Sequence, residues 1–133
     1  MKKAQEGTKV LPGNLHVPGE CRAISEVLSR VGDKWTVLVI SSLGEGPKRF
    51  GELRKALGSI SKRMLTLTLR ALERDGLVKR TVFPTVPPRV DYELNRLGHS
   101  LLKPVTGMAI WARKHRPNIE DARRKFDTSN NVS

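Results

Sequence analysis

The sequence has little cysteine, few acidic residues and no long apolar run. Its 133 residues include one cysteine, Cys21, which excludes an intrachain disulfide. The longest apolar run, residues 37–40, is far shorter than the roughly twenty residues needed to cross a bilayer, so a transmembrane helix is excluded. The first residues lead into no apolar stretch of the kind found in signal peptides. We therefore expect a cytoplasmic protein without a membrane partner.

The sequence also lacks the patterns of common catalytic and metal sites. His16, His99 and His115 do not have the spacing of metal ligands, and no cysteine or carboxylate pair lies near them to complete a site. There is no glycine-rich phosphate loop, nucleophile elbow or paired-acid arrangement. We therefore expect no catalytic residue, no metal and no cofactor, and a protein that is not an enzyme.

Basic residues, in contrast, are abundant. The chain has 25 Lys and Arg against 13 Asp and Glu, which gives a net charge of +12. Such an excess on a short chain predicts a polyanionic partner. The alternative is that the positive charge only keeps the protein soluble. The hydrophobic fraction of 38 % is ordinary for a globular domain, so the chain is expected to build a core.

Composition and periodicity divide the chain into three parts. Residues 1–19 mix Lys, Gly, Pro and Asn without a period and predict a flexible N-terminal arm. Residues 20–116 contain the periodic segments and predict one folded domain. Residues 117–133 are basic, end in polar residues and predict a partly disordered tail.

The folded part begins with two predicted helices. Cys21, Ile24, Leu28 and Val31 follow a helical spacing that stops at a glycine. A second helix is predicted over 33–43, with an aspartate at its N-cap and a glycine after its end.

The next two predicted helices form a helix-turn-helix pattern. They cover residues 50–57 and 61–75 and are joined by a very short turn that contains a glycine. In the second of them, Leu65, Leu69 and Leu72 lie on one face and basic residues on the opposite face. The pattern therefore separates a buried face from a solvent face.

After residue 76 the apolar period changes from that of a helix to that of a strand. Strands are predicted around 78–82 and 89–94. The prolines of segment 84–88 cannot continue a strand ladder, but they stiffen an extended loop. A helix-turn-helix followed by a two-stranded wing is the order of a winged helix. We therefore predict an α+β, mainly helical fold of the winged helix-turn-helix type.

A last helix is predicted over about residues 96–115, bent by a proline and a glycine. Its apolar stripe consists of Leu101, Val105, Met108 and Trp111. One alternative is that this stripe packs on its own domain. We favour a homodimer interface that also includes Ile24 and Leu28 of the first helix, because a small winged core has little surface left to cover.

The basic residues concentrate in the predicted helix-turn-helix and wing, which predicts DNA binding. An α-helix fits the major groove of B-DNA, where Arg, Lys and Thr contact base edges. Lys62, Arg63 and Thr66, in the first turns of the helix, are the candidates for base reading. The other predicted DNA contacts, mainly to phosphates, are Lys48, Arg49, Ser61, Arg70, Arg74, Lys79 and Arg89. Basic residues over 113–125 either extend the phosphate contacts or remain solvated.

A series of motifs, in the same order along the chain over about residues 20–115, resembles those of a known family. They are Cys21, Gly32-Asp33-Lys34-Trp35, Gly46-Pro47-Lys48-Arg49-Phe50-Gly51-Glu52-Leu53, the stretches 60–66 and 69–78, Pro84-Thr85-Val86-Pro87-Pro88-Arg89-Val90-Asp91-Tyr92, Leu97-Gly98, Pro104 and Trp111. The Pro-Thr-Val-Pro-Pro tip of the wing is the most specific of them. With these motifs the sequence resembles the HxlR-type winged helix-turn-helix transcriptional regulators of bacteria.

The resemblance implies a homodimeric, sequence-specific regulator that binds a pseudo-palindromic operator in double-stranded DNA and dimerises through its terminal helices. Similar proteins often carry polar residues where this chain has Leu67 and Thr68, so the operator sequence does not carry over. The alternative function is non-specific nucleic-acid binding, as in an architectural or RNA-binding protein, for which the net charge alone suffices. A small-molecule or electrophile effector is a further expected partner, but no set of residues identifies it.

Cys21 matches the position at which some similar regulators carry a cysteine that senses oxidants or electrophiles. Without a second cysteine, its reversible products are a disulfide between two subunits or a mixed disulfide with a small thiol. The alternative is that Cys21 is a small buried hydrophobe on the stripe of the first helix. Redox sensing therefore requires that the thiol be exposed.

Overall fold

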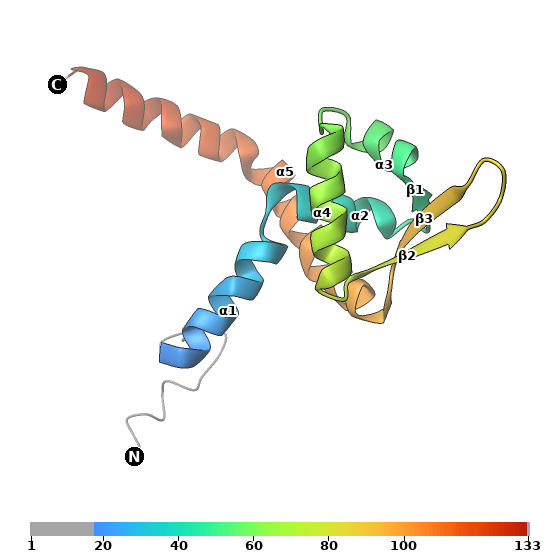
Figure 1. Ribbon diagram of the computed structural model, residues 1–133. Coiled ribbons are helices and arrows are strands. Elements are labelled where there is room, and N and C mark those ends of the chain that lie inside the picture. Colours follow the sequence, from blue (N-terminus) through green and yellow to red (C-terminus); the bar gives the residue numbers. More distant parts are fainter. Residues whose placement is uncertain (1–17, 133) are drawn as a thin grey trace, which may run out of the picture.

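A computed structural model describes residues 18–132, which form five helices and one small antiparallel sheet (Figure 1). In chain order the elements are α1 (Pro18–Val31), α2 (Lys34–Leu43), β1 (Lys48–Arg49), α3 (Phe50–Leu57), α4 (Lys62–Arg74), β2 (Val78–Phe83), β3 (Arg89–Leu94) and α5 (Arg96–Val132). The order confirms the predicted winged helix-turn-helix. No helix within the described range is long and apolar enough to span a membrane.

Two of the helices begin at the side-chain caps that the sequence predicts. The Asp33 carboxylate accepts hydrogen bonds from the backbone N–H groups of Trp35, at 3.1 Å, and Thr36, at 3.3 Å. The Ser61 hydroxyl oxygen accepts one from the N–H of Met64 at 3.0 Å. These bonds satisfy backbone donors that have no partner inside the helix, and so they fix where α2 and α4 begin.

The end of α4 is set by a glycine. Gly76 has a φ of 76°, a left-handed conformation that glycine adopts without a Cβ penalty. The chain reverses there, and the N–H of Leu77 donates to the carbonyl of Leu72 at 2.9 Å. This closure directs the chain straight from α4 into the first strand of the wing.

The sheet has the order β1-β3-β2, so it contains one strand more than the predicted two-stranded wing. β2 pairs with β3 from Val78 opposite Leu94 to Phe83 opposite Arg89. The unpredicted strand β1 places Lys48 opposite Tyr92. A two-residue strand is too short to show an alternating pattern, and for this reason the sequence did not reveal it.

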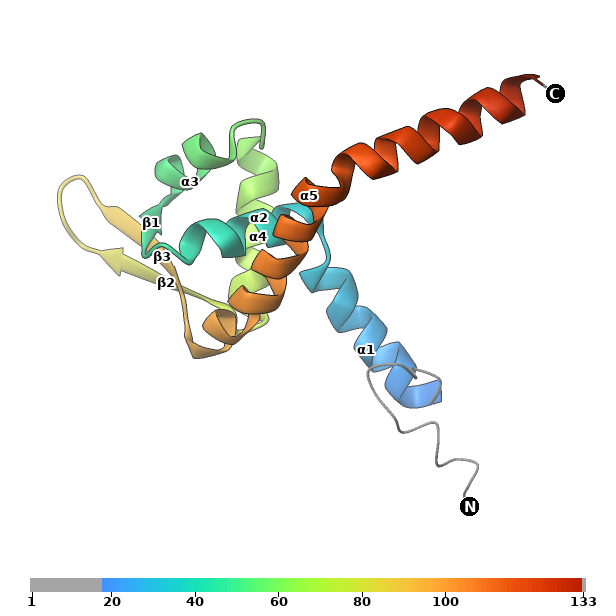
Figure 2. The same cartoon turned by 180° about the vertical axis from the view of Figure 1, so that it is seen from behind.

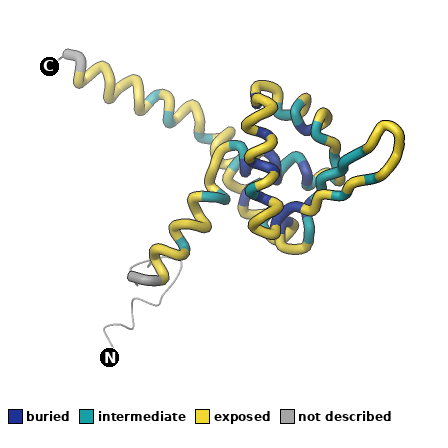
Figure 3. Tube along the Cα trace, viewed as in Figure 1, coloured by how far each residue is buried: buried dark blue, intermediate teal, exposed yellow. Residues whose placement is uncertain are grey.

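The core lies where α2, α4, the sheet and the first part of α5 meet (Figure 3). Leu65, Leu69 and Leu72 of α4 are at most 1 % exposed, as their shared helix face predicts. Burying each such side chain contributes about 1.5 to 3 kcal/mol. The other buried hydrophobic residues are Val39, Ile40, Leu43, Leu53, Ile60, Leu77, Val78, Leu94 and Val105. The buried face of α4 therefore anchors the helix and leaves its other face free.

At the C-terminal end, where a partly disordered tail was expected, the structure continues α5 through residues 117–132. Ion pairs one turn apart stabilise this part of the helix, between Arg116 and Glu120 at 3.1 Å and between Lys125 and Asp121 at 3.2 Å. α5 bends between the part that packs on the core and the part that projects (Figures 1 and 2). Proline residues, of which α5 contains two, remove backbone donors from a helix and bend it.

The N-terminal end also differs from the prediction. Residues 1–17 of the expected arm lie outside the described residues, but helix α1 begins at Pro18, inside the stretch assigned to the arm. Proline is well tolerated in the first helical turn because its missing N–H is not needed there. α1 and the C-terminal half of α5 leave the body on the same side as two separate projections (Figures 1 and 2). We call α1 and the part of α5 beyond Val105 the two arms.

Candidate nucleic-acid interface

Helix α4 presents a basic face to solvent. The predicted base-reading residues Lys62, Arg63 and Thr66 are exposed, and so is Arg70 one turn further along. In Figure 1 this helix lies in front of α2 and faces the viewer, with the hairpin of β2 and β3 beside it. The core holds the helix from behind. Helix α4 is thus anchored by its buried face and exposes its polar face, the arrangement in which a helix can enter a major groove.

One residue of this face was missed by the sequence analysis. Leu67 is 49 % exposed, although a leucine in an amphipathic helix is ordinarily counted with the core. At about 100° per residue its direction falls close to those of Arg63, Arg70 and Arg74. Helical phase was the signal that could have identified it. The apolar side chain therefore interrupts an otherwise polar surface.

The turn before α4 is held by contacts from α3. The Arg54 Nε donates to the carbonyl of Ile60 at 3.4 Å, and the Glu52 carboxylate accepts from the Arg49 backbone N–H at 2.8 Å. Arg54 is half-buried, so it is used inside the motif rather than on its surface. The Arg54 bond ties α3 to the turn before α4, whereas the Glu52 bond caps the N-terminus of α3.

Lys48 and Arg49 lie on the edge strand β1. The Lys48 ammonium donates to the Glu45 carboxylate at 2.9 Å, and this hydrogen bond and the charge of Lys48 lower the pKa of Glu45. The side chain of Lys48 is only 19 % exposed, whereas Arg49 is exposed. Of the two predicted phosphate contacts on this strand, Arg49 is therefore the more accessible.

The wing fixes Arg89 at its base and exposes its tip. The Arg89 guanidinium lies over the Phe83 ring, 4.3 Å from its centre, and its Nε is 3.3 Å from an Asp91 carboxylate oxygen. At the tip, the Thr85 hydroxyl donates to the carbonyl of Pro87 at 2.7 Å. Val86 beside it is completely exposed. The wing therefore presents an apolar tip above an oriented cation.

The residues predicted to bind DNA thus lie in the half of the molecule that contains the helix-turn-helix and the sheet. The pairing of β1 with β3 brings Lys48 and Arg49 beside the base of the wing, and Lys79 is exposed on β2. Ser61 is exposed at the start of α4 but already accepts the capping hydrogen bond. Within the described residues, no group of three or more His, Cys, Asp or Glu side chains is arranged to hold a metal ion.

The two arms carry the residues assigned to oxidant sensing and to dimerisation. Cys21 on α1 is exposed in the single chain, which is not the buried position of the alternative. Leu28 is 51 % exposed, and Met108 and Trp111 on α5 are 55 % and 56 % exposed. Ile24 is half-buried. The two helices therefore carry apolar side chains that solvent reaches in a single chain.

Two residues of the predicted dimer stripe belong to the domain core instead. Val105 is 2 % exposed and lies in the core cluster, and Leu101 packs against that cluster. Because α5 begins its course against α2, the early part of its stripe is covered by its own domain. Val105 thus has no free surface for a partner, and the part of the stripe that remains open begins beyond it.

Comparison with known proteins agrees with this architecture. The model of the HxlR-like helix-turn-helix family matches residues 30–120. The HTH-type transcriptional regulator YtfH of Escherichia coli strain K12 is 40 % identical over 94 residues, which cover 71 % of this chain and 75 % of that protein.

Solved structures give the same result. The putative transcriptional regulator YtfH from Salmonella typhimurium is 38 % identical with a TM-score of 0.71, over 75 % of this chain and 89 % of that one. The redox regulator HypR in its oxidised form is 40 % identical with a TM-score of 0.65, over 69 % of this chain and 95 % of that one. The chain therefore belongs to the HxlR-like helix-turn-helix family of transcriptional regulators.

Proposed function

We propose that this protein is a homodimeric, sequence-specific DNA-binding regulator whose helix α4 enters the major groove of its operator. The observation that carries the proposal is the division of α4 into a leucine face buried in the core and an exposed face that bears Lys62, Arg63 and Thr66. Arginine and lysine donate to guanine O6 and N7, and threonine contacts several base edges. Membership of a family of DNA-binding regulators supports the same function.

The other exposed groups have separate roles in this proposal. Arg70 and Arg49, together with Lys79 on β2, contact phosphates and set the position of the protein on the duplex. Leu67 faces the groove among the cations and contacts a thymine methyl group, the apolar feature that the major groove offers. The wing tip and Arg89 lie along the neighbouring backbone or minor groove.

The arms form the dimer. Leu28, Met108 and Trp111 expose apolar surface that a second copy of the chain would cover, and most soluble oligomers are two-fold symmetric. Two symmetric reading heads require a nearly palindromic operator whose half-sites are about 34 Å apart, or a multiple of that distance. The exposed part of the α5 stripe, beyond Val105, is the surface used.

We further propose that oxidants act on the regulator through Cys21. The thiol is exposed on an arm, and the similar regulator HypR is described as a redox regulator. Two Cys21 thiols from two subunits form one disulfide and give up two electrons and two protons, which reduce an oxidant such as diamide to its hydrazine. A mixed disulfide with a small thiol is the alternative product.

The decisive experiment selects bound fragments from the source genome with the full chain at about 150 mM salt and with excess scrambled duplex, because salt suppresses phosphate-only binding. Recovery of one palindromic site supports the proposal. Equal recovery of all sequences, with a steep salt dependence, would instead assign the net charge of +12 to non-specific binding.

The redox proposal is tested separately. Wild-type protein and Cys21→Ser are treated with diamide, and adducts and operator binding are then measured. A covalent dimer or mixed disulfide in the wild type alone, accompanied by altered operator binding, is expected. Unchanged binding without any adduct would remove Cys21 from the proposed function.

A further inference from the structure

A cleft opens where the first arm meets the end of the reading helix. It has a volume of about 740 Å³, within the size range of small-molecule sites. Its walls come from α1, from the C-terminal end of α4 together with Leu77 after it, and from the first turns of α5. The apolar lining consists of Val27, Val31, Leu77, Leu97 and Leu101. Of the residues on these walls, Arg74 also belongs to the basic face of α4, and the others have no part in the DNA-contact scheme proposed above.

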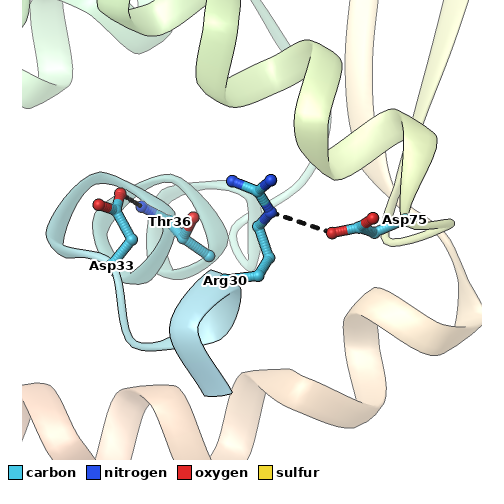
Figure 4. Close-up of polar contacts among 4 residues, drawn as sticks. All are labelled: Arg30, Asp33, Thr36 and Asp75. Carbon is cyan, nitrogen blue, oxygen red and sulfur yellow. Dashed lines mark hydrogen bonds and ion pairs between the residues drawn. The ribbon is translucent and has the colours of Figure 1, made fainter. Parts of the chain in front are cut away.

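Arg30, which lines this cleft, forms an ion pair through only one of its guanidinium nitrogens. The Arg30 Nε donates to the Asp75 carboxylate at 3.1 Å, and Figure 4 shows the two terminal nitrogens of the guanidinium directed away from that bond. Within the described part of the chain, Arg30 has no other ion pair. Asp75 thereby holds the guanidinium plane in place and leaves its outer edge free. That edge matches the two oxygens of a carboxylate.

The charges of the lining decide what kind of anion fits. Arg30 and Arg74 are matched in number by Glu26 and Asp75, so the cleft has no net charge to attract a polyanion such as a nucleotide. Leu97 is 55 % exposed and Val27 is 61 % exposed, so apolar surface remains for a ligand to cover. The free guanidinium edge and the apolar walls together call for a small apolar molecule with a single carboxylate.

We propose that this cleft binds an organic monocarboxylate, with its carboxylate on the outer edge of Arg30 and its apolar body against Leu97 and Leu101. The proposal rests on the proposed function in one respect, the regulatory consequence. Asp75 is the C-cap residue of α4, and Arg30 lies in the last turn of α1, so a ligand on this pair touches both the reading helix and an arm. Operator affinity changes if the ligand prefers one arrangement of the two.

The test uses the full chain with 1-naphthoate as the probe and its neutral isostere 1-naphthamide as the reference, measured by calorimetry without DNA. We expect saturable binding of the carboxylate and about tenfold weaker binding of the amide, the effect of about 1.4 kcal/mol for a charge-assisted bond. Arg30→Gln should abolish the difference. Arg30→Lys keeps a cation for Asp75 but lacks the flat edge, and it should also bind more weakly.

Arg22→Gln is the matched control, because Arg22 is an exposed arginine of α1 that does not line the cleft. It should bind the carboxylate like the wild type. Equal binding of carboxylate and amide, unchanged binding by Arg30→Gln, or no saturable binding up to the solubility limit would each overturn the proposal. A change of oligomeric state in Arg30→Gln, with ligand binding unaltered, would assign the cleft to the partner subunit instead.

The outcome is separable from that of the proposed function. Carboxylate binding is measured on the free protein, and operator binding is then measured with and without 1-naphthoate. If the carboxylate binds but no operator is found, the site stands and the proposed function fails. If an operator is bound but no carboxylate binds, the site fails alone.

Discussion

Among single residues, Arg63 and Lys79 are the sharpest test of how this protein recognises DNA. Both are exposed cations, but one lies in the first turns of α4 and the other on the strand β2. Arg63→Ala should weaken operator binding by about 1 to 3 kcal/mol and relax base preference at one operator position. The reason is that guanine O6 and N7 lose the hydrogen-bond donors that the arginine supplies. Competition binding against single-base variants of the operator measures this effect.

Lys79→Ala is the matched control. It should weaken binding to every sequence alike. It should also reduce the slope of log affinity against log salt concentration by about one, the effect of one lost phosphate contact. If the two variants lose the same affinity on all duplexes, the assignment of base reading to Arg63 is wrong.

Gly98 and Gly107 differ only in their surroundings. Both lie in α5, but a Cβ at Gly98 would collide with the backbone carbonyl of Leu77, whereas a Cβ at Gly107 meets nothing within 4 Å. Gly98→Ala should therefore lower the free energy of unfolding by about 1 to 3 kcal/mol, the cost of overpacking. Gly107→Ala should raise it by about 0.5 to 1 kcal/mol through helix propensity. Urea unfolding measures both, and equal signs would contradict the packing of α5 described here.

Among the elements, α4 depends on its first turn. Ser61→Ala removes the acceptor for the Met64 N–H and should lower the free energy of unfolding by about 1 kcal/mol. Base contacts in that turn should weaken with it, because the turn frays. Ser61→Asn restores the cap without adding charge and should recover the stability. Thermal unfolding of the two variants checks this, and loss of stability in both would show that the cap is not the cause.

Sequence patterns predict the elements unequally. The bounds of α3 and α4 followed from glycines, a serine cap and a 3.6-residue period, all of which act within a few residues. β1 did not follow, because its two residues become a strand only by pairing with β3. The final turns of α5 were also missed, since polar residues and a proline outweighed the ion pairs that support the helix.

At the scale of the whole molecule, the exposed arms predict assembly. Trp111→Glu with Met108→Glu places two carboxylates on the open part of the α5 stripe and should convert the proposed dimer to a monomer with weaker operator binding. Analytical ultracentrifugation measures the change. Val82→Glu is the control for oligomeric state, because Val82 is 50 % exposed on the wing, away from the arms. A dimer that survives the double substitution would contradict the proposed interface.

The candidate site could be predicted only in part. The exposure of Lys62, Arg63 and Thr66 on one face could be predicted, because the face of a helix follows from residue spacing. The same spacing also places Leu67 on this face. The roles of Val105 and Arg30 could not be found in this way, because whether Val105 is covered and what Arg30 contacts depend on segments that are distant in the sequence.

The sequence by itself determined the winged helix-turn-helix, the basic face of the helix that we propose reads DNA and the excess of positive charge, because caps, periods and composition are local properties of the chain. Only the tertiary structure decided that Val105 belongs to the core, that Cys21 is exposed and that Arg30 meets Asp75 across a cleft. The physical reason is that burial and ion pairing depend on which surfaces meet in space, and these surfaces belong to α1, α4 and α5, which are separated along the chain.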